Sequence, residues 1–165
     1  TLIEDGPRAL QKPEDYDLRA NIMWCATLAL NGLIGAGVPQ DWATHMIGHE
    51  ITAMHGLDHA QTLAIVLPSV MTLKKDAKCE KLLQYAERVW GITGENAELV
   101  IDEAIDLTRG FFESLGIKTR LSEYGIGPES IPALVEQLKA HGMVKLGEHR
   151  DITPEVSRRI LEMSL

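Results

Sequence analysis

The sequence has 165 residues, of which 45% are hydrophobic and 5% aromatic, so it can build one core, made mainly of aliphatic side chains. The formal net charge is −8 and no run of basic residues is longer than two, which argues against binding to nucleic acid or to an anionic membrane. There is no signal peptide, no apolar run of about 18 residues and no CxxC motif, so we expect a cytoplasmic protein without a membrane span or a disulfide framework.

Apolar residues recur at steps of three and four along most of the chain, which predicts helices. The first helix is predicted over Pro13–Ala36 and the second over Gln40–Met54, with Gly56 as the stop signal after it. Asp58 is predicted to cap a third helix that carries the apolar run Leu63–Leu67 up to Pro68 or through it. A buried strand is the alternative for this run, but neither flank offers a partner strand, and we therefore prefer a helix.

The rest of the chain also follows helical spacing. Thr153 followed by Pro154 is a strong signal for the start of the last helix, because threonine caps well and proline is favoured at the first helical position. The further predicted helices are Cys79–Trp90, Ala97–Leu115, Ile131–His141 and Thr153–Met163. The predicted fold is all-α, an irregular array of about seven helices within one domain over residues 1–165.

Four of the six histidines lie within fifteen residues, at positions 45, 49, 55 and 59. On a helix His45 and His49 share one face, and a tight turn at Gly56 can bring His59 back towards them. Imidazole suits iron, zinc and related divalent metals. The alternative is that these histidines are independent polar or core residues, and His55, beside Gly56, fits a turn residue best.

Several other kinds of site find no support in the sequence. The zincin motif fails, because Met46 follows His45 and Ala53 stands where a second histidine would be needed after His49. No cysteine lies near the histidines, so a closed structural zinc site is not expected. The chain has no G-x-S-x-G elbow and no glycine-rich phosphate loop, and we assign it no cofactor-binding residues.

Two stretches around these histidines, Gly35–Glu50 and Leu57–Pro68, resemble the iron-containing alcohol dehydrogenase family. The later stretches Leu121–Gly125 and Ile131–Leu134 resemble its distal helices, so the likeness covers essentially the whole chain. It is greatest to the branch of NADPH-dependent aldehyde reductases and butanol dehydrogenases. The specific part is the histidine spacing of four and then ten. One departure is Ala60 after His59, where many members have glycine.

The resemblance implies a role for each of three histidines. His45 and His59 match two metal ligands of the family, and His49 matches a catalytic histidine beside the metal that helps to relay a proton. The family's other two ligands, an aspartate and a histidine, are expected in sequence that precedes Thr1. On this basis residues 1–165 are the helical C-terminal metal- and substrate-binding domain of a two-domain enzyme, and the N-terminal nucleotide-binding domain is absent from this chain.

The resemblance also implies the chemistry. It implies an NAD(P)H-dependent alcohol dehydrogenase or aldehyde reductase for small aldehydes and alcohols, with iron or zinc, with NADP(H) in preference to NAD(H), and with a homodimeric full-length protein. We expect the chain alone to be inactive. A metal-dependent helical hydrolase and a non-catalytic helical interaction module are the alternatives. The hydrolase would need a second, carboxylate-rich metal motif, and metal analysis would separate the interaction module from both enzymes.

Overall fold

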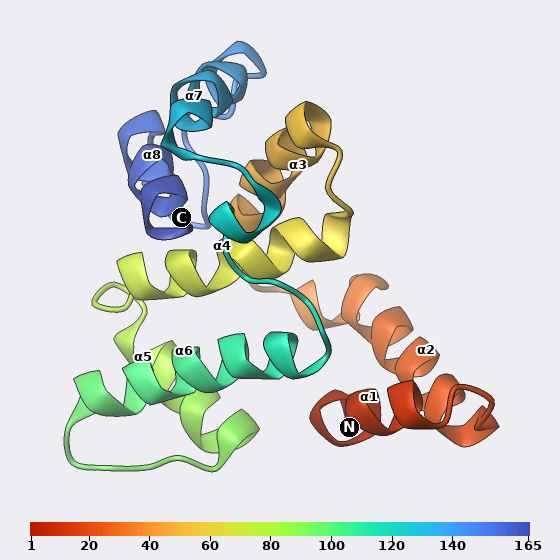
Figure 1. The fold of residues 1–165 in the computed structure, drawn as a ribbon. Helices are drawn as coiled ribbons and strands as arrows, with labels where there is room; N and C mark the ends of the chain where they lie inside the picture. The colour runs from red at the N-terminus through yellow and green to blue at the C-terminus, as the bar shows by residue number, and fades with distance from the viewer.

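The computed structural model describes all residues from 1 to 165 and consists of helices joined by short connections (Figure 1). Strand-like pairing is limited to one isolated bridge between Leu146 and Ile152, which confirms the all-α prediction. No helix is both long and apolar enough to cross a bilayer. The α-helices are α1 (Leu2–Gln11), α2 (Tyr16–Leu30), α3 (Ala43–His55), α4 (His59–Leu73), α5 (Cys79–Tyr85), α6 (Ala97–Ser114), α7 (Ile131–Ala140) and α8 (Pro154–Met163).

The first third of the chain differs from the prediction in two ways. The helix α1 was not predicted, because Gly6 and Pro7 are poor helix formers and interrupt its pattern. The single helix predicted over Pro13–Ala36 is shorter: α2 begins after Asp15, whose carboxylate accepts hydrogen bonds from two backbone amides of the first turn. It ends before Gly32, which has a left-handed backbone (φ 85°), and a short 3-10 turn follows.

The main core lies where α3, α4, α7 and α8 meet. Figure 1 shows α7 and α8 beside α3, with α4 running beneath them and α5 and α6 on the other side of α4. Most of the core is aliphatic, as the low aromatic content predicts. It comprises Ala43, Ile47, Ile51, Ile65, Val66, Val70, Leu121, Ile126, Ile131, Leu134, Val135, Leu138, Leu146, Ile152, Ile160 and Leu161.

The apolar run in the middle of the chain is helical, as predicted, and α4 continues through Pro68 to Leu73. The helix starts with a capping box, in which the Asp58 side chain and the Gln61 side chain each bind a backbone amide of the other. Burial of one long face against α3, α6 and α8 sustains the helix across the proline, because tertiary packing outweighs one lost backbone hydrogen bond.

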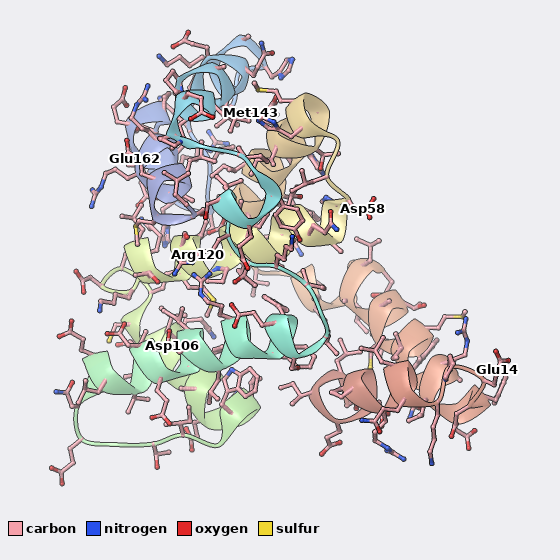
Figure 2. The ribbon with its side chains drawn as sticks, in the orientation of Figure 1. Glu14, Asp58, Asp106, Arg120, Met143 and Glu162 are labelled. Atoms are coloured by element: carbon pink, nitrogen blue, oxygen red, sulfur yellow. The ribbon has the colours of Figure 1, made fainter.

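The helices α1 and α2 form an arm that packs mainly upon itself. Figure 1 shows the pair extending to one side of the molecule, and Glu14, in the turn between them, marks the outer end (Figure 2). Asp5 is buried between the two helices and accepts hydrogen bonds from Arg8 (3.0 Å) and Asn21 (2.8 Å). Leu18 is the one buried residue of α2, so this arm contributes little to the core.

Candidate metal centre

The hairpin of α3 and α4 brings the predicted histidines together. α3 ends at His55, and Gly56 takes a left-handed conformation (φ 72°) that ends the helix as predicted. Only three residues, 56 to 58, separate the two helices. Asp58 stands at the start of α4 (Figure 2) and its capping box fixes the first turn, so His59 is the first residue of α4.

The two helices approach closely at Gly48. A Cβ atom at this position would lie 2.9 Å from Oγ1 of Thr62, which is nearer than two such atoms can come. Thr62 is fully buried, and its hydroxyl donates to the carbonyl oxygen of His59 at 2.9 Å. Gly48 therefore allows α3 to lie against the first turn of α4, and the next residue along α3 is His49.

As a result the rings of His45, His49 and His59 lie close together. The ring centres of His45 and His59 are 5.2 Å apart, those of His49 and His59 are 4.9 Å apart, and those of His45 and His49 are 6.2 Å apart. The spacing of four and then ten residues thus becomes one cluster. His55 has no ring contact with the other three, and its Nε2 atom is buried without a hydrogen-bond partner.

The spacing of these rings fits metal ligation. Two imidazoles bound to one tetrahedral Zn²⁺ through nitrogens at about 2.0–2.1 Å place their ring centres roughly 5 Å apart. Two of the three pairs have this spacing, and His59 belongs to both. No group of three or more His, Cys, Asp or Glu side chains in the chain is arranged to hold a metal ion. What these residues offer is therefore a pair of imidazoles, a partial coordination shell.

The electrostatics of His45 suit a ligand. Burial is the main cause that lowers the pKa of His45 below its ordinary value of 6.5, and the neighbouring charges of His59 and His49 lower it further. A metal binds the neutral form of imidazole, so a lowered pKa keeps His45 available for ligation at neutral pH.

Ionic contacts fix the start of α3, and the sequence analysis did not find them. One oxygen of Asp41 accepts from the amide of Ala43 at 2.8 Å, and the other contacts Nζ of Lys78 at 2.5 Å. Lys78 also donates to Glu148 at 2.9 Å. Asp41, two positions before the helix, carries a local capping signal, but Lys78 and Glu148 lie 37 and 107 residues away in sequence and give none.

Comparison with known proteins gives the same family throughout. The family model for "Fe-containing alcohol dehydrogenase family, C-terminal" matches residues 1–164. NADPH-dependent aldehyde reductase YqhD of Escherichia coli is 68% identical over 162 residues, which cover 98% of this chain and 42% of that protein. NADH-dependent butanol dehydrogenase A of Clostridium acetobutylicum is 36% identical over 167 residues, 99% of this chain and 43% of that protein.

A solved structure agrees in three dimensions. A crystal structure of Escherichia coli YqhD matches this chain with a TM-score of 0.98 at 66% identity, and the match covers 99% of this chain and 42% of that chain. The chain thus spans less than half the length of the relatives it matches.

Proposed function

The chain belongs to the iron-containing alcohol dehydrogenase family, and we propose that residues 1–165 form the metal- and substrate-binding domain of an NAD(P)H-dependent enzyme that interconverts small aldehydes and alcohols. The observation that carries the proposal is the cluster of three imidazoles at the α3–α4 hairpin. The names of the two curated relatives, an aldehyde reductase and a butanol dehydrogenase, support the substrate class. Neither the hydrolase nor the interaction module has such support.

Each of the three histidines receives a role in this proposal. His45 and His59 bind the metal through neutral imidazole nitrogens, with ring centres 5.2 Å apart. When bound, the metal supplies Lewis-acid polarisation of the carbonyl group, and the reduced nicotinamide supplies the hydride. His49 is exposed beside His59, and a ring nitrogen of His49 passes a proton to the oxygen that becomes the alcohol. Imidazole suits this task because it generally titrates at about pH 6.5.

The remaining parts of the enzyme are proposed to lie outside residues 1–165. These parts are a nucleotide-binding domain and the other two metal ligands, an aspartate and a histidine. The proposal agrees with the lengths of the two curated relatives, because the match to this chain covers 42% of one and 43% of the other. We propose NADP(H) as the cofactor, because the 68% identical relative is NADPH-dependent. Iron or zinc as the metal, a homodimeric enzyme and a cytoplasmic location stay predictions.

The roles can be tested in the complete protein by measuring metal content and turnover together. We expect His45→Ala and His59→Ala to lose the metal and the activity at once. His49→Ala should keep the metal and lose about 100-fold in kcat, because a positioned acid–base group contributes roughly 10²–10⁴-fold. His149→Ala, an exposed histidine outside the cluster, is the matched control and should change neither quantity.

The opposite pattern would contradict the assignment. If His49→Ala released the metal while His45→Ala retained it, the ligand and proton-relay roles would be exchanged, because both residues form a pair of suitable spacing with His59.

A further inference from the structure

Trp42 occupies a position that local helix chemistry does not explain. It is the N-cap residue of α3, where short polar side chains are favoured, and its side chain makes no capping hydrogen bond. Trp42 is also 42% exposed and belongs to none of the apolar clusters. Neither the start of the helix nor the core therefore requires an indole at this position.

The indole of Trp42 instead contacts the ring of a proposed metal ligand. Its ring centre lies 4.9 Å from that of His45, with an angle of 66° between the planes, which is an edge-to-face aromatic contact. A histidine that binds a metal usually has a hydrogen-bond partner that fixes the orientation of its ring. Among the six histidines only His141 has a hydrogen-bonded ring, through Glu50. Within this chain His45 therefore has ring contacts in place of a hydrogen bond, and the contact with Trp42 is the one that does not come from another histidine of the cluster.

The backbone on both sides of Trp42 is held in place. Ala43, the next residue, is fully buried, and its amide donates to the carboxylate of Asp41, the preceding residue. Asp41 is fixed in turn by Lys78 at 2.5 Å. Because the residues before and after Trp42 are fixed, the backbone that carries the indole has little freedom to move relative to His45.

We propose that Trp42 is a positioning residue of the metal centre, whose indole holds the imidazole of His45 in the orientation that binds the metal. It takes the place that a hydrogen-bond partner has at many other metal-binding histidines. The inference rests on the proposed function, because it requires His45 to be a ligand. It adds a residue outside the three histidines to the centre, and it gives a reason for a tryptophan at the start of α3.

The test compares an aromatic and a non-aromatic replacement in the complete protein. The dissociation constant for Zn²⁺ is measured by competition with a chromophoric chelator. We expect Trp42→Leu to weaken Zn²⁺ binding about tenfold, the lower end of the effect of losing an orienting partner. Trp42→Phe keeps a ring against His45 and should stay within about threefold of the parent protein. Trp24→Leu, at an exposed tryptophan of α2, is the matched control and should have no effect.

A spectrum provides a second readout that a purely structural role would not change. With Co²⁺ bound, Trp42→Leu should alter the visible absorption bands of the metal, whereas Trp42→Phe should preserve them. Unfolding midpoints of the metal-free variants identify any loss of folding, and Trp42→Met is the second non-aromatic variant should the leucine variant not fold.

His45→Ala separates a failure of this inference from a failure of the proposed function. If His45→Ala binds Zn²⁺ as tightly as the parent protein, the proposed metal site is wrong and the inference falls with it. If His45→Ala loses Zn²⁺ but the non-aromatic variants at Trp42 bind it normally, only the positioning role is overturned. Equal weakening by leucine and phenylalanine would also overturn it, because the aromatic contact would then not matter.

Discussion

Two helical hairpins of this chain, α1–α2 and α3–α4, have similar connections and very different surroundings. In α3–α4 the residues Ile51 and Ile65 are fully buried, because α7 and α8 pack over the pair. In α2 the residues Met23, Trp24 and Leu30 are 72%, 62% and 77% exposed. Both α2 and the α3–α4 hairpin are rich in apolar residues at helical spacing, so this spacing indicates a helix but not its burial. Burial depends on helices that come much later in the sequence.

The largest expected difference between the two hairpins is in the cost of shortening one aliphatic side chain to alanine in each of them. Ile65→Ala in α4 should lower the free energy of unfolding by about 2–5 kcal/mol, because a fully buried side chain leaves a cavity. Leu30→Ala in α2 removes a side chain of comparable size that is already exposed. It should change the free energy of unfolding by less than about 0.5 kcal/mol. Urea unfolding of both variants measures the difference. Equal losses would show that α2 is covered in solution.

The features that the sequence predicts correctly are those with a local cause. The cap at Asp58, the stop at Gly56 and the start at Thr153 each depend on residues within one helical turn. The helix α1 escaped prediction because its interior contains Gly6 and Pro7, and it is held by the contact of Asp5 with Asn21, sixteen residues away. Long-range contacts of this kind leave no periodic signal.

Part of the candidate site also has a local cause in the sequence, and part depends on contacts that only the structure shows. The spacing of His45, His49 and His59 predicts their convergence, because one helix face and one tight turn suffice for it. The close approach of Gly48 to Thr62, which sets how the two helices cross, required the structure. The individual roles of the histidines stay a prediction, since the ring spacing suits two different pairs.

An intermediate effect is expected where α3 is tied to distant segments. Lys78→Ala leaves Asp41 and Glu148, both about four-fifths buried, without their cation. We expect a loss of about 1–3 kcal/mol, the usual result of leaving a buried polar group unpaired. Lys81→Ala, at an exposed lysine whose ammonium donates a hydrogen bond to Gln84, is the control and should be nearly neutral. A neutral Lys78→Ala would mean that α3 does not need this anchor.

The same contacts predict a dependence on pH. Burial alone would raise the pKa of Asp41, but hydrogen bonds from Lys78 and Ala43 outweigh it and hold the pKa below its ordinary value of 3.8. The stabilisation is therefore fully present above pH 3.8 and is lost as the pH falls through the lower pKa of the folded state. Melting temperatures between pH 7 and 3 should show the onset of this loss below pH 3.8 in the parent protein and much less of it in Lys78→Ala.

The smallest expected effect on the whole molecule lies in the arm. Asn21→Ala removes the amide that donates to Asp5 at 2.8 Å, and Asp5 is 7% exposed, so about 0.5–1.5 kcal/mol of local stability should be lost. Because α1 and α2 pack mainly on each other, this loss should open the arm without unfolding the core. Hydrogen exchange should become faster in the amides of α1, while the urea midpoint of the main transition stays the same. Glu14→Ala, in the exposed turn of the arm, should alter neither (Figure 2). A lower midpoint in Asn21→Ala would instead show that the arm and the core unfold as one cooperative unit. The two hairpins would then differ in how deeply their side chains are buried but not in their stability.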